Sequence, residues 1–450
     1  MGDKSLKVRG GTGFFQGRLP LVFFTNMPTN SGMIQYNAQV NEKNASKNGF
    51  TMDKFAGDII TDKNKLQETL IGLGYPKTIS PDQGALSSGM CAVDPDFKLP
   101  LVWKTSVAVD YSLPTDFPLS VSAEGIYTKN IYETTIRDYA VPDVNGFARF
   151  NGADNRPIFP DNFTGGKKNL YVLENTTKGY GFQSSVTVKA EPTRNISLMA
   201  AYTHTVKKEL TSLPGSNASS VLNYVSTVEG PNSMKLHNGA NVTPDRFIAN
   251  ATFHDKANNH YSIIYETWRG GNAYSYEMTN DMNGDGFNYD AMYIPTDEEV
   301  ANGMFRFVDK DSETRFMDYV HNNSYLKDHQ GEYAEPYSVY SPWVHRVDFS
   351  YKHDFKFNIA NTEHKIQLSA DIKNLLNLFN SKWGVSKIAN TNFTGSSSDI
   401  RVLTYEGVDE QGYATFSTPK GISGDTKMWG RNHAIGQCWY MSIGIKYIFN

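Results

Sequence analysis

CWYMSIGIKYIFN, at Cys438–Asn450, has a large apolar residue at every second position. These residues are Trp439, Met441, Ile443, Ile445, Tyr447 and Phe449. Most residues between them are small or polar, such as Ser442, Gly444 and Lys446. A period of two is typical of a β-strand with one apolar face. The stretch is about as long as a tilted strand that crosses a bilayer, and aromatic residues stand at both ends of its apolar face. A core strand of a soluble β-sandwich fits the same pattern.

The composition excludes several other classes of protein. The chain has 450 residues, which is too long for one ordinary soluble domain, with 39% hydrophobic and 13% aromatic residues. No run of 18 apolar residues occurs, so the sequence predicts no transmembrane helix. A net charge of −4 argues against nucleic acid as the partner. Two distant cysteines, Cys91 and Cys438, indicate neither a disulfide framework nor a zinc site.

The same alternation recurs upstream and predicts about nine strands. They are Leu101–Tyr111, Leu119–Lys129, Gly179–Ala190, Ile196–Lys207, Asp245–His254, His260–Trp268, Val344–Phe355, Lys365–Lys373 and Trp439–Phe449. Residues 1–96 are dense in Gly, Pro and Asn, and we interpret them as an irregular region with a short helix near Lys63–Leu70.

The connections between these strands alternate strictly in length from residue 101 onward. Short turns at 112–118, 191–195, 255–259 and 356–364 alternate with long connections at 130–178, 208–244, 269–343 and 374–437. Outer-membrane β-barrels have this order, with short periplasmic turns and long extracellular loops. The polar residues opposite each apolar face suit a wet lumen. The sequence therefore favours an all-β, antiparallel transmembrane barrel over a soluble β-protein.

Five stretches, in register along the chain, resemble a known family. They are RGGTGFFQGRLPLVFFTNMPTNSG (Arg9–Gly32), NDMNGDGFNYDAMYIP (Asn280–Pro295), NSYLKDHQGEYAEPYSVYSPWVHRVDFS (Asn323–Ser350), SADIKNLLNLFNSKWG (Ser369–Gly384) and WYMSIGIKYIF near the end. Together they are similar to the C-terminal half of an Oar-like TonB-dependent receptor of Bacteroidota, an outer-membrane transporter.

The resemblance implies a 22-stranded barrel, a plug domain and a TonB-contacting segment. This chain shows no plug and has about 9–10 strands, so we expect a partial barrel. We expect residues 1–96 to be an irregular extracellular-loop region and residues 97–450 to be the C-terminal portion of the barrel. The first residues show no signal peptide, which suggests a missing N-terminal half. The expected fold is a curved, open antiparallel sheet with two free edges.

The function implied by the resemblance is active substrate import across the outer membrane. The implied partners are outer-membrane lipid, the TonB complex through the missing half, and an unidentified peptide or glycan. No nucleic acid is expected, and the sequence contains no GxSxG, Walker A or HExxH motif, so we expect no enzyme. Two alternatives remain open. One is a secreted, soluble β-rich protein that binds or cleaves glycans, and the other is a surface adhesion protein anchored by a barrel.

One motif has the spacing of a cation site. In DMNGDG, the oxygens of Asp281, Asn283 and Asp285 recur at every second position before Gly286, as in the first half of an EF-hand calcium loop. The glutamate expected six residues after the glycine is replaced by Met292. Asp290 is the candidate to complete the shell. The motif predicts calcium, or else a plain Asp/Asn/Gly turn.

Two further features have open interpretations. The asparagines Asn374 and Asn377 of NLLN follow a strand, and we expect them to hydrogen-bond loop backbone. Tyrosines are frequent in the long connections, where they could line a ligand mouth or pack the loops onto themselves. They include Tyr274, Tyr276, Tyr289, Tyr293, Tyr333, Tyr337 and Tyr340.

Overall fold

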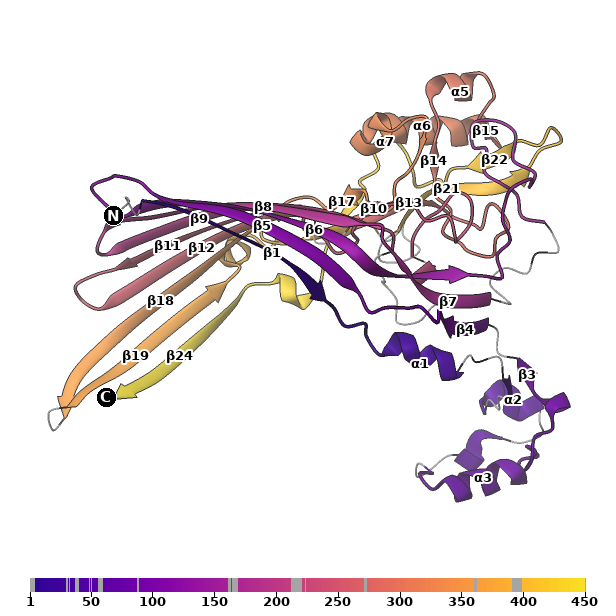
Figure 1. Ribbon diagram of the computed structural model, residues 1–450, viewed down its shortest axis with the longest axis horizontal. Helices are drawn as coiled ribbons and strands as arrows, with labels where there is room; N and C mark the ends of the chain where they lie inside the picture. Colours follow the sequence, from indigo (N-terminus) through magenta and orange to yellow (C-terminus); the bar gives the residue numbers. More distant parts are fainter. Residues whose placement is uncertain are drawn as a thin grey trace.

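The computed structural model describes most of the chain. The described residues are 5–29, 31, 33–36, 40–47, 49, 51–55, 60–86, 89–160, 163, 169–211, 221–222, 224–270, 273–359, 362–390 and 399–449. Their main feature is one large sheet, in which strands run from one end of the molecule to a cluster of loops at the other end (Figure 1).

Ten strands follow one another in this sheet, and each pairs antiparallel with its neighbours. In order they are β1 (Leu6–Gln16), β5 (Leu101–Ser112), β6 (Leu119–Asp138), β8 (Tyr180–Thr193), β9 (Ile196–Glu209), β11 (Asp245–His254), β12 (Asn259–Arg269), β18 (Val344–Ile359), β19 (Thr362–Lys373) and β24 (Tyr440–Phe449). All nine strands predicted from alternation are confirmed. In the described part, β1 and β24 stand at the two ends of this order, so the fold is an open, partial antiparallel β-barrel.

The interpretation of residues 1–96 as irregular was wrong for several segments, and the longest of them is a strand of the main sheet. Leu6–Gln16 forms β1, which pairs with β5 along its whole length. The sequence did not predict this strand because it contains several glycines, and glycine is depleted in strands. At Gly10 a β-carbon would lie 2.8 Å from the carbonyl oxygen of Ser106, so the close approach of β5 requires a glycine there.

The strand register sorts apolar and polar residues into separate rows across the sheet. One row is apolar in eight strands: Leu119, Ala190, Leu198, Ala251, Ile263, Phe349, Ile372 and Met441. The neighbouring row is polar in six strands: Ser197, Thr252, Ser262, Ser350, Asp371 and Ser442. Successive side chains point to opposite faces of a sheet, so one face is apolar and the other is polar.

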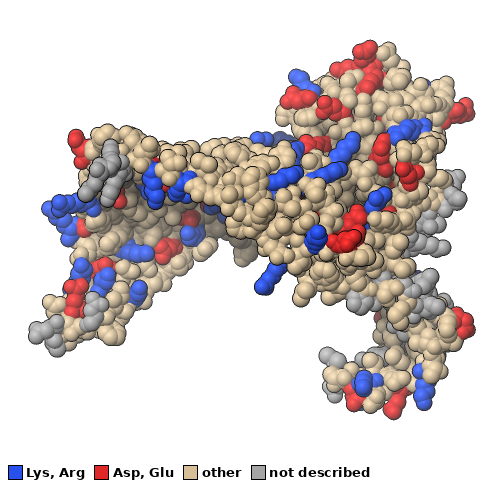
Figure 2. All heavy atoms as spheres, in the orientation of Figure 1, with Lys and Arg blue, Asp and Glu red and all other residues tan. Residues whose placement is uncertain are grey.

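The apolar face is open to the surroundings. On β24, Ile443 and Ile445 have relative exposures of 74% and 76%. Figure 2 shows Lys and Arg, with several Asp and Glu among them, at the end of the sheet far from the loops, while the strand surface between that end and the loops is mostly uncharged. None of the helices in the described part is both long and apolar enough to span a membrane.

The short turns lie at one end of the sheet and the long connections at the other (Figure 1). The turn between β11 and β12 shows why such turns can be short. The Asp255 carboxylate accepts the backbone N–H groups of Ala257 and Asn259, and Asn258 takes a left-handed φ of 61°.

The long connections pack together rather than standing as separate loops. We call this body, formed by the described residues within 139–179, 210–244, 270–343 and 374–439, the loop module. It contains a second sheet in the order β15 (Arg306–Phe307), β22 (Ala414–Ser417), β21 (Asp399–Val408), β13 (Ala273–Met278) and β17 (Val339–Tyr340). Its helices include α5 (Asp297–Ala301), α6 (Lys310–Asn322) and α7 (Ser324–Asp328), and β14 (Tyr293–Ile294) pairs with β16 (Glu332–Tyr333).

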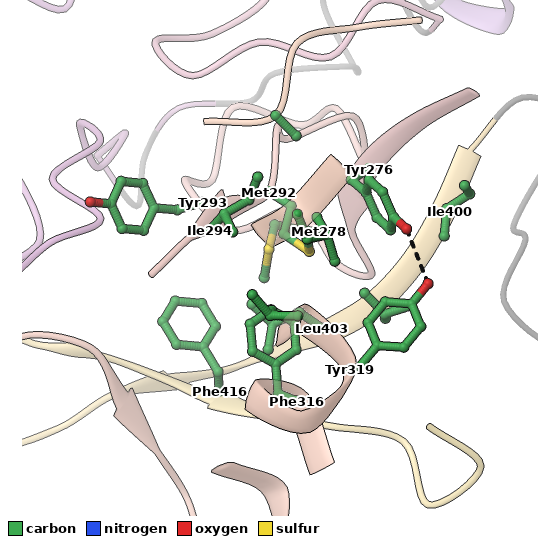
Figure 3. Close-up of a cluster of buried hydrophobic side chains, with 14 of the residues drawn as sticks. Tyr276, Met278, Met292, Tyr293, Ile294, Phe316, Tyr319, Ile400, Leu403 and Phe416 are labelled. Atoms are coloured by element: carbon green, nitrogen blue, oxygen red, sulfur yellow. Dashed lines mark hydrogen bonds between the residues drawn. The ribbon is translucent and has the colours of Figure 1, made fainter. Parts of the chain in front are cut away.

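The loop module has its own hydrophobic core. Helix α6 begins after the N-cap Asp309 and buries Phe316, Met317, Tyr319 and Val320, the spacing of one helix face. These side chains meet residues of β13 and β21 that are distant in sequence (Figure 3). The labelled members of that cluster are Tyr276, Met278, Met292, Tyr293, Ile294, Phe316, Tyr319, Ile400, Leu403 and Phe416.

The segment before β5 contains helices α1 (Val22–Thr29), α2 (Glu42–Lys47) and α3 (Lys63–Gly72). The predicted helix at Lys63–Leu70 is confirmed as α3, whose N-cap Asp62 accepts two backbone N–H groups. This segment returns to the sheet through β4 (Gly89–Val93), which pairs with β7 (Asn169–Thr176). β7 in turn pairs with the far end of β6.

Candidate functional site

The acidic turn at 281–290 is folded by its own side chains. Asp281 accepts the N–H groups of Gly284 and Gly286 at 2.8 Å each, and Asp285 accepts that of Phe287 at 2.8 Å. Gly284 and Gly286 have φ values of 79° and 87°, which favour glycine. The turn alternative, in which these side chains order the backbone, is thus present in the structure.

The carboxylate of Asp290 bonds both to the turn and to a buried ionic network. Its Oδ1 lies 2.9 Å from Nη1 of Arg156, and its Oδ2 accepts the N–H of Met282 at 2.7 Å. Arg156, which is fully buried, also donates to both oxygens of Asp154 at 2.9 and 2.8 Å. The guanidinium donates further to the carbonyl of Ala291 at 2.6 Å. One cation therefore joins residues 154–156 to residues 290–291.

Burial raises the pKa values of the carboxyl groups in the acidic turn. Burial, together with the charges of Asp290 and Asp281, raises the pKa of Asp285 to about 8. Burial also raises the pKa of Asp290 to about 6, although Arg156 opposes that change. The pKa of Asp281 is raised by burial as well. For Arg156, burial alone would lower the pKa, but Asp154 and Asp290 outweigh it and raise the pKa.

The described side chains do not converge into a finished metal shell. Within the ranges given above, no three His, Cys, Asp or Glu groups are placed to hold a metal ion. Asn283 turns its Oδ1 to the N–H of Asp285 at 3.0 Å, and its buried Nδ2 has no partner. Carboxylate and amide oxygens are nevertheless the ligand types that Ca²⁺ prefers. Calcium at Asp281, Asn283, Asp285 and Asp290 stays a prediction.

Most of the tyrosines singled out in the sequence pack the loop module. Tyr274, Tyr276, Tyr293 and Tyr337 are buried. The hydroxyls of Tyr276 and Tyr319 are 3.0 Å apart in the core (Figure 3). Tyr333 is different, because it lines a cavity.

This cavity, here called the loop cavity, has a volume of about 420 Å³. Its lining comes from three separate stretches of the chain: Ser226, Thr227, Val228, Glu229, Ser233, Lys235 and Leu236, then Ala291, then Glu332, Tyr333, Ala334, Glu335 and Pro336. The volume falls in the roughly 300–1,000 Å³ range of small-molecule sites. No sequence motif predicted this cavity, because its walls come together only in the folded chain.

Hydrogen bonds fix the walls of the loop cavity. Thr227 exchanges backbone bonds with Tyr289 and Ala291 at 3.0 and 2.9 Å. Tyr333 donates its hydroxyl to Asp154 at 2.9 Å, which connects the cavity to the Arg156 network. Burial next to Asp154 raises the pKa of Tyr333, so this hydroxyl stays a donor.

The asparagine prediction is confirmed at the base of the loop module. Asn374 Nδ2 donates to the carbonyls of Gly384 and Gln437 at 3.0 and 2.8 Å. Asn377 Nδ2 donates to those of Ser381 and Trp383 at 3.0 and 2.9 Å. Both side-chain amides therefore hydrogen-bond to backbone carbonyls and order the loops, which is a structural role.

Comparisons with known proteins give a likeness to a solved structure. No family model and no curated protein matches the sequence. Among solved structures, the outer membrane transporter YddB from Escherichia coli is similar with a TM-score of 0.36 and 11% identity. The likeness covers 82% of this chain and 35% of the YddB chain, so this chain spans about a third of that protein.

Proposed function

We propose that this protein is an outer-membrane import receptor, and that the ten strands from β1 to β24 form part of its transmembrane β-barrel. One observation carries the proposal. The apolar row from Leu119 to Met441 crosses eight antiparallel strands, and the next row on the opposite face is polar. A barrel wall with lipid on one side and a wet lumen on the other needs this arrangement.

The exposed apolar side chains weigh against the soluble alternative. Burying one large apolar side chain contributes about 1.5–3 kcal/mol, and soluble proteins rarely expose large contiguous apolar patches. On this sheet such residues are exposed on strand after strand, including Val107, Val186, Leu198, Ile263, Phe355, Leu368, Ile443 and Ile445. Outer-membrane lipid is the partner that would cover them.

The polar face and the loop module suit substrate handling rather than anchoring alone. A barrel that served only as an anchor for adhesion would not need a preformed cavity at its loop end. The loop cavity and the polar rows favour capture of a substrate outside and its passage inside. In this proposal the TonB complex supplies the energy, and the substrate is a peptide or a glycan.

Deletion and fractionation in the native host test the proposal. The protein should be recovered from the outer membrane only with detergent, and its deletion should abolish uptake of the substrate. An uncoupler that collapses the inner-membrane proton gradient should stop uptake while surface binding remains. Recovery as a soluble protein would overturn the proposal in favour of the secreted alternative. Unchanged uptake with loss of surface attachment would instead support adhesion.

A further inference from the structure

We propose that the loop cavity binds a short peptide with free termini. Lys235 would hold the carboxylate at one end of the peptide, and Glu332 would hold the ammonium group at the other end. The inference rests on the proposed import function and names the substrate class. Both side chains line the cavity.

Four charged residues line the cavity, but two of them are already neutralised. Glu229 lies 2.8 Å from Arg149, and Glu335 pairs with Lys208. For Lys235 and Glu332, the described residues supply no ion-pair partner. The cavity therefore offers one positive and one negative group to a ligand. A zwitterion matches both charges, whereas a cation or an anion alone would leave one of them unmatched.

The size and the walls fit a peptide of about two residues. A cube of 420 Å³ has an edge of about 7.5 Å, and an extended chain spans roughly 3.3–3.6 Å per residue. Val228, Leu236, Ala291 and Pro336 give the cavity apolar surface for side chains. The bonds from Thr227 to Tyr289 and from Tyr333 to Asp154 hold the walls in place before binding.

The same lining disfavours a glycan. Sugars stack on open aromatic faces, and Tyr333 is the single aromatic residue among the described residues that line the cavity. The Arg156 guanidinium lies 5.4 Å from the centroid of that ring, and the Tyr293 ring packs against it edge-on at 5.0 Å. Its hydroxyl is bound to Asp154. The described part of the lining also contains no Asn, Gln or Asp, whose planar groups suit pairs of sugar hydroxyls.

Calorimetric titration of the full chain, purified in detergent, tests the inference. The probes are alanyl-leucine and N-acetyl-alanyl-leucinamide, which share their side chains; the second lacks both terminal charges and carries an added acetyl group. The free dipeptide should bind, and the blocked one should bind at least tenfold more weakly. Lys235→Gln and Glu332→Gln should each weaken binding of the free dipeptide about tenfold. Lys310→Gln, at an exposed lysine of α6, and Glu410→Gln, at an exposed glutamate, are the matched controls and should leave it unchanged.

A cycle between variant and probe makes the result specific. In Lys235→Gln, amidation of the peptide carboxylate should cost nothing further, because its partner is gone. Equal binding of free and blocked dipeptides to the unaltered protein would overturn the inference, as would tighter binding of maltotriose. Peptide binding without peptide uptake in cells would leave the inference standing and remove the import function. Peptide uptake that is the same in the two variants as in the unaltered protein would support the import function and overturn the inference about the loop cavity.

Discussion

Arg156 and Asp290 meet inside the loop module, with Nη1 2.9 Å from Oδ1 and both side chains withdrawn from solvent. They belong to connections that leave the sheet at different strands. Since Asp290 also accepts the N–H of Met282, the pair joins the acidic turn to residues 154–156. The cavity wall at Tyr333 depends on the same network through Asp154.

Replacing Arg156 should therefore loosen the loop module. Breaking a buried ion pair from one side costs about 3–5 kcal/mol, because the remaining charges stay buried and unpaired. In Arg156→Met we expect the module to melt earlier in calorimetry, with Asp154 and Asp290 left without a cation. Arg149→Met is the control, since its pair with Glu229 is half-exposed and is worth about 0–1 kcal/mol. Equal losses in both variants would contradict the assignment.

The register of β24 predicts opposite outcomes for neighbouring residues. Ile443 lies opposite Ala370 on the apolar face, and Ser442 lies opposite Asp371 on the polar face. Ile443→Arg should destabilise the protein in lipid by roughly 2–4 kcal/mol if the position is at mid-bilayer. Ser442→Arg should cost far less. Urea titration in lipid vesicles measures both, and similar values would rule out this orientation.

The pH dependence of the loop module should follow from Asp285. Its pKa is about 8 in the folded chain, against a usual value of 3.8, so the folded state binds the proton more tightly. The free energy of unfolding should fall as pH rises from about 4 to 8. Asp285→Asn, which keeps the acceptor for the Phe287 N–H, should flatten this slope. Thermal melts at pH 5 and 8 give the comparison, and an unchanged slope would count against the assignment.

Calcium should oppose the same destabilisation. At pH 8 a divalent cation bound through Asp281, Asn283, Asp285 and Asp290 would neutralise their crowded oxygens. Millimolar Ca²⁺ should then raise the melting temperature of the unaltered protein and leave that of Asp285→Asn almost unchanged. The same concentration of Mg²⁺ is the control, because Mg²⁺ demands a stricter octahedral shell. An equal shift in both proteins would mean that calcium acts elsewhere.

The two ends of the sheet should lie on opposite sides of the membrane. Lys310 is in the loop module and Lys256 is in the short turn between β11 and β12. In a chain with Cys91 and Cys438 replaced by serine, Lys310→Cys should react with an impermeant maleimide on intact cells. Lys256→Cys should react only after the outer membrane is opened. If only Lys256→Cys were labelled on intact cells, the protein would have the opposite orientation in the membrane.

The sequence by itself determined the barrel strands and their faces. Alternation with a period of two depends only on neighbours along the chain, so each strand from Leu101 to Phe449 could be read locally. The exception was Leu6–Gln16, where glycines remove the alternating side chains that carry the signal. The motif at 281–290 was also visible locally, since its bonds join residues at most eight apart.

Only the tertiary structure decided what the long connections do. Their core joins α6 to strands such as β21, far along the chain, and such contacts leave no local period. Arg156 and Asp290 are separated by 134 positions, and the walls of the loop cavity come from three stretches. The raised pKa of Asp285 likewise depends on burial, which no single stretch of sequence determines.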